Sequence, residues 1–332
     1  MQYSATPPNC RAIAWAAAAA MMIAATPGHT QQPQQTQTKT LKILVGFAAG
    51  GPADIVARLV GTRMGEILGQ GVVIENRGGA GGYIATEAAA RAEPDGTTIL
   101  MTPLANAANE AIYKARKIKY GESLTAVAAV AETANVLVVH PSLGAKSVAA
   151  LIALAKSKPG DIVYASAGRG TATHLTSELF NLMAGVKLSP VHYRGGGETI
   201  RDLLSGEVKV MFSSIPPVLE FIKENQLIGV ATTGPKRDVA LPDLPTVAES
   251  GLPGFDMRLW LGFLAPSGTP RPVIDRLAAS VAQSLKSPDT VKALAAQGFD
   301  PLVGGPDEFD RFMRSEIVKW GKVVEAVGIT PE

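Results

Sequence analysis

Four side chains have the types that hydrolysis by a nucleophilic serine requires. Ser166, His174, His192 and Asp202 come from neighbouring expected elements, so a serine, a base and a carboxylate could meet in the fold. The chain has no GxSxG turn, which is what lifts a nucleophilic serine above a sheet. An exported serine hydrolase or esterase, with Ser166 as nucleophile, is therefore kept as an alternative hypothesis.

Glycine-rich turns between a strand and a helix indicate different chemistry, the binding of an anion. Residues 48–51, Ala-Ala-Gly-Gly, join an apolar run to an amphipathic helix, and the plan recurs at residues 78–82 and 166–171. The first N–H groups of a helix have no partner within it and attract anions, and glycines let a ligand approach the backbone closely. Three such turns predict a cleft that binds a carboxylate.

The side chains beside these turns have both a structural and a ligand-binding interpretation. Asp54 lies in the first turn of a helix, where we expect it to accept backbone N–H bonds from the turn before it. Thr171 and Thr173 either cap their own helix or donate to a carboxylate. His174 either packs in a first helical turn or donates to a ligand oxygen.

Two arginines and a run of glycines extend this candidate set. Arg169 and Arg194 carry forked donors that suit a carboxylate, or else they face solvent. Gly195, Gly196 and Gly197 stand in succession, which costs chain entropy on folding. We expect a ligand or the opposing lobe to pass close to them, with a flexible loop as the alternative.

Motifs for cofactors, metals and nucleic acids are missing. After Gly168-Arg169-Gly170, the third glycine of a dinucleotide-binding turn is replaced by Thr173, and there is no GxxxxGK[ST], HExxH or paired-cysteine motif. The net charge of +2 and the few aromatic residues give no sign of a basic surface for nucleic acid. We expect no cofactor, no metal and no nucleic-acid partner.

The elements that must position these residues follow an alternating pattern. From Leu41 onward, short apolar strands alternate with helix-length segments, which favours an α/β fold with parallel sheets. A chain of 332 residues exceeds the usual size of one core, so we expect two lobes, with strand crossings near residues 134–141 and 255–266. The expected strands are residues 42–47, 72–75, 98–102, 126–130, 136–139, 162–166, 189–193, 208–212 and 258–265. The expected helices are residues 54–68, 82–92, 106–112, 147–157, from 171 onward, 196–204, 272–286, 289–297 and 306–327.

The first 28 residues have the pattern of an export signal. Arg11 precedes an apolar run at residues 12–25, which is shorter than the roughly 20 residues that span a membrane. The polar residues 29–40 are expected to form a disordered linker. Cys10, the single cysteine, precedes the run, so neither a lipid anchor nor a disulfide is expected. We expect a periplasmic protein from which the signal is cleaved.

Five segments, in this order, resemble the substrate-binding proteins of tripartite tricarboxylate transporters, the Bug family. They are VGFAAGGPADIVAR, VVIENRGGAGGYIATEAAARAEPDGTTIL, YASAGRGTATHLTSELF, VHYRGGGETIRDLLSGEVKVMF and LPDLPTVAESGLPGFD. The resemblance implies a two-lobed periplasmic binding fold (type II-like, a Venus flytrap) with lobe 1 at residues 41–138 and 258–332 and lobe 2 at 139–257. It implies a binding protein and not an enzyme. The implied ligand is a dicarboxylate, tricarboxylate or aromatic acid that is captured and passed to membrane permease subunits.

The resemblance also implies ligand loops at residues 48–54, 166–174 and 193–197. Ser213 follows Phe212 at a position where the family often has an acidic residue, which favours a carboxylate ligand without an amino group. Ala49 stands at a position where the family often has proline. A ligand sensor for a membrane kinase would have the same fold and stays an alternative. The sequence contains no heptad pattern that would indicate self-association, so we expect a monomer. The expected ligand-binding residues are Ala48, Ala49, Gly50, Gly51, Asp54, Ser166, Gly168, Arg169, Gly170, Thr171, Thr173, His174, Tyr193, Gly195, Gly196 and Ser213.

Overall fold

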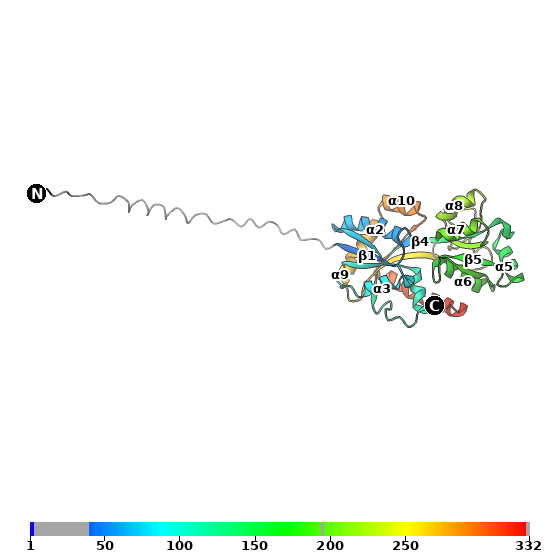
Figure 1. Ribbon diagram of the computed structural model, residues 1–332, viewed down its shortest axis with the longest axis horizontal. Helices are drawn as coiled ribbons and strands as arrows, with labels where there is room; N and C mark the ends of the chain where they lie inside the picture. Colours follow the sequence, from blue (N-terminus) through cyan, green and yellow to red (C-terminus); the bar gives the residue numbers. More distant parts are fainter. Residues whose placement is uncertain (3–39, 194–195, 330–332) are drawn as a thin grey trace. The chain divides into compact units, whose positions relative to one another are not determined.

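The computed structural model describes residues 1–2, 40–193 and 196–329 (Figure 1). The chain divides into two units, Met1–Gln37 and Thr38–Glu332, and every helix and strand given below belongs to the second. The expected export signal at residues 1–28 and linker at 29–40 lie outside the described residues, apart from Met1, Gln2 and Thr40.

Sheet A begins with three parallel strands. β1 (Leu41–Val45) lies between β2 (Val72–Asn76) and β3 (Thr98–Pro103). Its apolar residues are buried, as expected for a parallel strand covered on both faces. The chain returns to this sheet through β9 (Arg258–Pro266), antiparallel to β3, and β10 (Asp300–Gly304).

Sheet B has the same alternating plan. β5 (Val163–Ser166) pairs in parallel with β6 (Ser189–His192) and with β7 (Val210–Ser214). β8 (Ile228–Thr232) lies antiparallel to the long strand β4 (Leu124–Val139). The carboxyl ends of β5, β6 and β7 therefore open towards one edge of the sheet.

β4 joins the two sheets. It pairs with β9 from Leu124 to Ala134 and with β7 from Asn135 to Val139, so the expected strands 126–130 and 136–139 are one strand. The polar residues between them interrupt the apolar pattern but not the backbone pairing. Thr233 connects the second crossing to the first: Met257 N donates to Thr233 O just before β9 begins, and Thr233 N donates to Asn135 O of β4, both at 2.9 Å.

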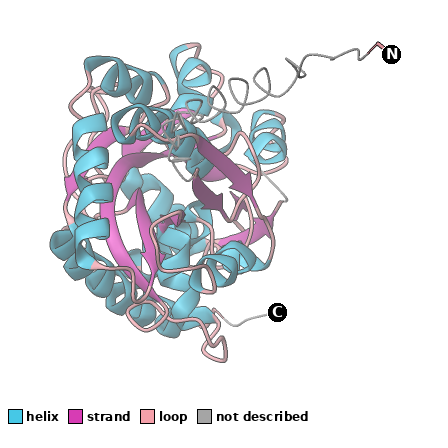
Figure 2. Cartoon of the chain, turned by 90° about the vertical axis from the view of Figure 1, so that its left-hand side faces the viewer, coloured by secondary structure: helices cyan, strands magenta, loops and turns pink. Residues whose placement is uncertain are grey.

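Helices surround the strands (Figure 2). They are α2 (Pro52–Leu68), α3 (Tyr83–Ala90), α4 (Leu104–Ile112), α5 (Val148–Ser157), α6 (Ala172–Ala184), α7 (Gly196–Leu204), α8 (Pro216–Lys223), α9 (Arg271–Ser284), α10 (Pro288–Ala296) and α11 (Pro306–Val327), with short 3₁₀ turns η1 (Ala80–Gly82) and η2 (Pro141–Leu143). The sequence missed α8, β8 and β10. α8 begins with Pro216-Pro217, and proline is well tolerated in the first turn of a helix.

Two apolar clusters form the core. The larger one spans sheet A and part of sheet B and includes the fully buried Trp260, Trp320 and Phe309. The smaller one packs sheet B, through Val138, against Leu203 of α7 and Val218 of α8. Within the described ranges, no helix has the length and apolar character needed to cross a membrane.

Candidate ligand-binding site

Asp54 holds the turn that follows β1. Its Oδ2 accepts hydrogen bonds from the backbone N–H of Gly50 and from Nε of Arg58, both at 2.9 Å, and Arg58 Nη2 lies 2.9 Å from Oδ1. Burial alone would raise the pKa of Asp54, but the bonds from Arg58 and Gly50 lower it below its usual value. Gly50 has φ of +78°, which favours glycine. The expected bond from the turn to Asp54 is therefore present, and the carboxylate stays ionised.

Asn76, at the end of β2, supports the same turn from the other side. Arg58 Nη2 donates to Asn76 Oδ1 at 3.2 Å, and Asn76 Nδ2 donates to Phe47 O at 3.1 Å. Ala48 and Ala49 are exposed. Gly51 is the N-cap of α2, and it offers no side chain that could cap this helix. The turn thus presents the open N-terminus of α2 on a braced backbone.

The glycine loop after β2 packs on the end of β1. Gly79, Gly81 and Gly82 all have positive φ. A Cβ on Gly46 would lie 2.7 Å from the Cα of Gly82, so only glycines allow the two backbones to approach this closely. The loop leads directly into α3.

Hydroxyl groups shape the turn between β5 and α6. Ser166 is fully buried, and its Oγ donates to Gly168 O at 3.0 Å and accepts from Gly168 N at 3.2 Å. Thr171 Oγ1 donates to the same carbonyl at 2.6 Å, and Thr173 Oγ1 accepts from Ala167 N at 3.0 Å. Thr171 is the N-cap of α6, but its side chain bonds the turn and does not cap the helix. Both threonines therefore stabilise the turn and leave the first amides of α6 open.

His174 is a neutral imidazole in the first turn of α6. The side chain is buried, and Nδ1 accepts the backbone N–H of Gly170 at 3.1 Å. Burial, with the charges of His192 and Arg169, lowers the pKa of His174 to about 3. The ring of His192 lies edge-on, with 4.8 Å between the ring centroids. Because Nδ1 accepts, the proton of the neutral ring is on Nε2, which is a donor.

The ends of β6 and β7 lie beside Ser166. His192 pairs with Ser166 in register, and Tyr193 N donates to Ser166 O at 2.8 Å. Burial and a hydrogen bond with Asp202 raise the pKa of the Tyr193 phenol. Ser213 is buried near the end of β7. Ser166, Tyr193 and Ser213 therefore share the carboxyl edge of sheet B.

The remaining predicted residues follow the same two turns. Arg169 is partly exposed in the turn before α6. Arg194 and Gly195 lie outside the described residues, and Gly196 begins α7. A Cβ on Gly197 would meet no described atom within 4 Å, so the expected approach of the opposing lobe is absent at that residue.

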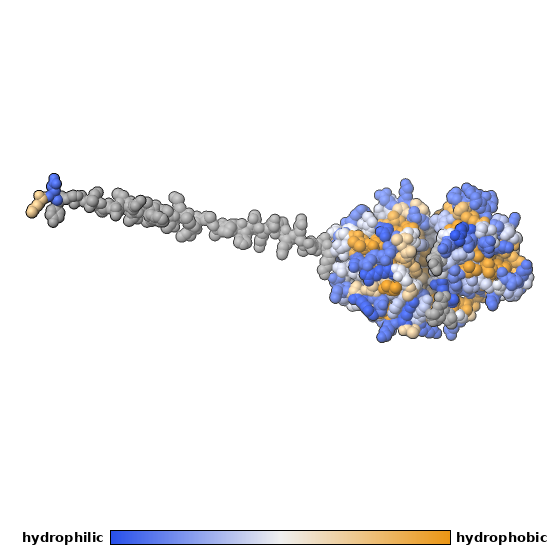
Figure 3. Space-filling view, viewed as in Figure 1, coloured by the Kyte–Doolittle hydropathy of each residue, from blue (hydrophilic) through white to orange (hydrophobic). Residues whose placement is uncertain are grey.

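The predicted residues thus form two groups, one on each sheet. Residues 48–54 follow β1 of sheet A, whereas residues 166–174, Tyr193 and Ser213 lie at the carboxyl ends of the sheet B strands. The surface has a furrow between the two halves (Figure 3). Ligands of open α/β sheets bind outside the carboxyl ends of parallel strands, which is where both groups lie.

The sequence missed three side chains that support these turns. Arg58 and Asn76 brace the turn after β1, and Asn109 of α4 donates from Nδ2 to Gly81 O at 2.7 Å. A sequence signal could have indicated the two asparagines. One stands at the end of a strand and the other on the buried face of the helix that follows a strand, and a buried amide needs hydrogen-bond partners.

A separate cavity lies beside α4. Its lining includes Tyr83, Thr102, Glu110, Tyr113 and Arg116, and none of the predicted ligand-binding residues. The Arg116 guanidinium lies 3.5 Å from the ring centroid of Tyr113 and 4.4 Å from that of Tyr83. Among the described residues, no group of three or more histidine, cysteine or acidic side chains is arranged to hold a metal ion.

Residues 56–329 match the family described as "Tripartite tricarboxylate transporter family receptor". The chain belongs to this family. It is 36% identical over 294 residues to Protein BugT of Bordetella pertussis. This alignment covers 87% of this chain and 90% of BugT. It is 35% identical over 282 residues to a protein from the tcbD-tcbE intergenic region of Pseudomonas sp. strain P51, covering 85% of this chain and 84% of the relative.

Solved structures share the fold of this family member. The periplasmic binding protein BugD has a TM-score of 0.76 and 31% identity, covering 88% of this chain and 99% of BugD. An R. palustris protein with adipate has a TM-score of 0.78 and 34% identity, and the match covers 89% of this chain and 99% of that protein. MatC from Rhodopseudomonas palustris with bound malate has a TM-score of 0.75 and 32% identity, and the match covers 86% of this chain and 99% of MatC. The predicted two-lobed α/β fold of a periplasmic binding protein is confirmed.

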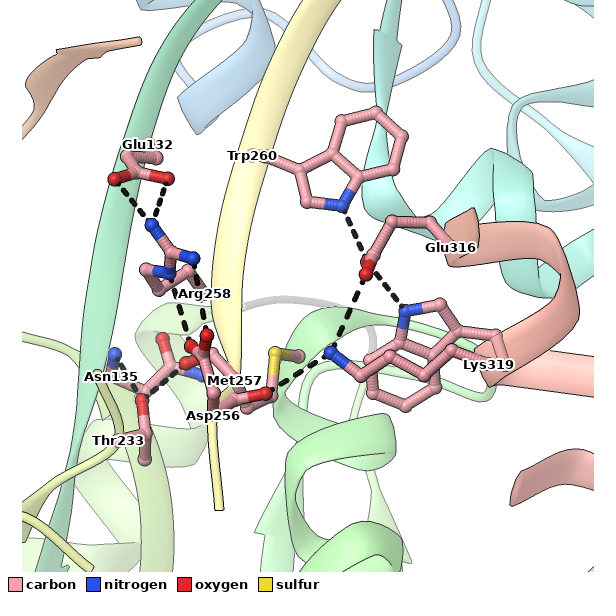
Figure 4. Close-up of polar contacts among 10 residues, drawn as sticks. Glu132, Asn135, Thr233, Asp256, Met257, Arg258, Trp260, Glu316 and Lys319 are labelled. Carbon is pink, nitrogen blue, oxygen red and sulfur yellow. Dashed lines mark hydrogen bonds and ion pairs between the residues drawn. The ribbon is translucent and has the colours of Figure 1, made fainter. Parts of the chain in front are cut away.

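A polar cluster surrounds the crossings of this receptor-family chain (Figure 4). Thr233 Oγ1 accepts from Asn135 N at 2.8 Å and donates to Met257 O at 2.6 Å, so one hydroxyl links both crossings. From α11, Lys319 Nζ donates to Asp256 O at 3.1 Å and lies 3.4 Å from Glu316 Oε1. Helix α11 is thereby attached to the second crossing.

Proposed function

We propose that this chain is a periplasmic receptor that captures a small carboxylate between two lobes and presents it to the membrane subunits of a tripartite transporter. The observation that carries the proposal is membership of the receptor family together with two structural neighbours, each above 30% identity, whose structures contain adipate or malate. Both of those molecules are dicarboxylates. A dicarboxylate is accordingly the first ligand class to test.

The two predicted groups of residues would form opposite walls of the site. In this proposal the open N-termini of α2 and α6 bind carboxylate oxygens, with Nε2 of His174 as a further donor. Ser213 carries no charge, so an ammonium group on the ligand would lack a counter-charge there. We therefore favour a carboxylate without an amine.

The proposed lobes follow the two sheets. Lobe 1 comprises residues 41–138 and 258–332, and lobe 2 comprises residues 139–257. The change of pairing partner along β4 between Ala134 and Asn135 supports a first boundary a few residues before 138. Ligand contact with both lobes would stabilise a closed state by shifting an equilibrium, without chemistry. We further propose that the receptor acts as a monomer.

The geometry around Ser166 favours binding over hydrolysis. Its hydroxyl donates to Gly168 O, and Nδ1 of His174 is occupied by Gly170 N. A nucleophilic serine needs its hydroxyl directed at a base. The Ser166 hydroxyl is instead part of the turn, which supports the proposal that the chain is not an enzyme.

Thermal unfolding of the protein without residues 1–28 tests the function. The protein is unfolded and refolded to remove carried-over ligand, then heated with malate, adipate, citrate, benzoate or aspartate. A ligand that binds only the folded state adds about 2.7 kcal/mol to the free energy of unfolding at 100 times its Kd. We expect malate or adipate to raise Tm without being consumed. No shift with any carboxylate, or turnover of an ester that Ser166→Ala abolishes, would contradict the proposal.

A further inference from the structure

Asn109 lies between a glycine loop of sheet A and a glycine turn of sheet B. It is on the buried face of α4, 7% exposed, among alanine, leucine and isoleucine side chains. Its Nδ2 donates to Gly81 O at 2.7 Å, and that carbonyl acceptor fixes which end of the amide is nitrogen. A Cβ on Gly81 would lie 3.0 Å from Nδ2, so the loop approaches the amide as closely as glycine allows.

The other end of the amide faces Gly170, which belongs to the turn before α6. A Cβ on Gly170 would lie 3.2 Å from Asn109 Oδ1 and 3.4 Å from Ile112 Cδ1. The backbone N–H of Gly170 is already used by His174, so the contact with Oδ1 is packing and not a hydrogen bond. The sheet B turn therefore lies close to an amide that is hydrogen-bonded to the sheet A loop.

This contact lies away from the crossing about which the halves would rotate. Asn135, at the crossing in β4, donates from Nδ2 to Thr176 Oγ1 of α6 at 3.0 Å. Thr176 is four residues into α6 from Ala172, about 6 Å along the helix axis. Rotation about the crossing would therefore move Gly170 relative to α4, while Asn109 stays bonded to Gly81.

We infer that Asn109 is a positioning residue for lobe closure: its amide holds the Gly81 loop and receives the Gly170 turn when the lobes close on a ligand. The inference rests on the proposed function. It adds a residue outside the predicted ligand-binding set that governs how the two walls of the site meet. Glycine is favoured at position 170 because its φ of +74° strains a side chain and a Cβ there would lie unusually close to the amide.

A double-mutant cycle with Asn109→Ala and Gly170→Ala tests the contact. In Gly170→Ala the new methyl group meets Asn109 Oδ1, and in the Asn109→Ala background that obstacle is gone, so the cycle isolates the contact from backbone strain. Tm is measured without ligand and with saturating malate or adipate, whichever raises the wild-type Tm. We expect a coupling of about 2 °C or more with ligand, and less than half of it without.

Affinity provides the second readout. We expect Asn109→Ala to weaken binding about tenfold by calorimetry, while Glu110→Gln, the neighbouring residue that faces the Tyr120 backbone N–H, keeps wild-type affinity. Asn109→Ser replaces Asn109→Ala if the latter does not fold. Equal coupling with and without ligand, no coupling in either, or unchanged affinity would overturn the inference. A wild-type protein that no carboxylate stabilises would instead overturn the proposed function.

Discussion

Arg258 Nη1 donates to both carboxylate oxygens of Glu132, at 2.6 and 2.7 Å, just where β9 begins beside β4. Its Nε and Nη2 donate to Asp256 at 3.0 and 3.1 Å. The guanidinium thus connects the second crossing to the strand that forms the first. A single amine could not make all four bonds, because only the planar fork of arginine points donors in these directions.

Arg258→Lys should therefore destabilise the fold. The pair is only partly buried, with side-chain exposures of 31% and 20%, so we expect a loss of about 1–2 kcal/mol in the free energy of unfolding. Urea denaturation measures it. Arg237→Lys is the matched control, because Arg237 and Glu249 form an exposed pair. Equal losses of stability in the two variants would show that the location of Arg258 at the second crossing does not increase its contribution to stability.

Glu316→Ala should loosen α11 from the second crossing. Glu316 Oε2 accepts from Nε1 of Trp260 at 2.8 Å and from Nε1 of Trp320 at 2.9 Å, and the side chain is 7% exposed. Removing the acceptor leaves two buried indole N–H groups unpaired, at about 1–3 kcal/mol each.

Tryptophan fluorescence makes this change visible. Trp260 and Trp320 are the tryptophans that remain once residues 1–28 are removed, and both donate to Glu316. We expect a shifted emission spectrum and a lower Tm for Glu316→Ala. Glu325→Ala, at an exposed position on the same helix, should change neither. Wild-type emission from Glu316→Ala would refute the predicted coupling.

Asp54→Ala should weaken carboxylate binding as well as stability, because the Gly50 N–H and the Arg58 guanidinium lose their acceptor. We expect a loss of about 1–3 kcal/mol in the free energy of unfolding. Glu87→Ala removes the acid of an exposed Glu87–Arg91 pair with the same four-residue spacing and should cost under about 0.5 kcal/mol. Since the pKa of Asp54 is lowered, its contribution is present above the ordinary value of 3.8 and is lost as pH falls below it.

His174 should make the protein less stable in mild acid. Its pKa falls from 6.5 to about 3 on folding, so between these values the unfolded chain binds a proton that the folded chain does not. Stability should therefore decrease as pH falls from 6.5 towards 3, by at most about 1.4 kcal/mol per pH unit from this residue. Urea midpoints of wild type and His174→Gln measured from pH 8 to 4 check this. Parallel profiles would contradict the prediction.

The sequence predicted the turns well because their signals are local. Glycines after an apolar strand and Asp54 in the next helical turn suffice to predict the β1–α2 turn and its hydrogen bond. The continuous strand β4 could not be predicted in the same way. Its polar middle, Glu132 to Asn135, matches a loop in pattern. The partners of these residues, Arg258, Thr233 and Thr176, lie 41 or more residues away in the chain.

The candidate site was predicted in part for the same reason. Glycines and hydroxyls beside helix starts are visible in sequence, but the role of Asn109 depends on two loops that meet it from different sheets. The three glycines at 195–197 indicate freedom of the backbone but do not indicate what approaches it, and no described atom lies within 4 Å of a Cβ on Gly197.

The Thr233 hydroxyl bonds the backbone of both crossings at once. Neither connecting chain is then free to bend without carrying the other along. Two independent connecting segments would let the lobes twist, slide and splay, whereas two segments bonded to one hydroxyl restrict those motions. The walls of the site would accordingly meet in the same register at every cycle, and recognition would depend on how far they travel, not on the direction from which they come.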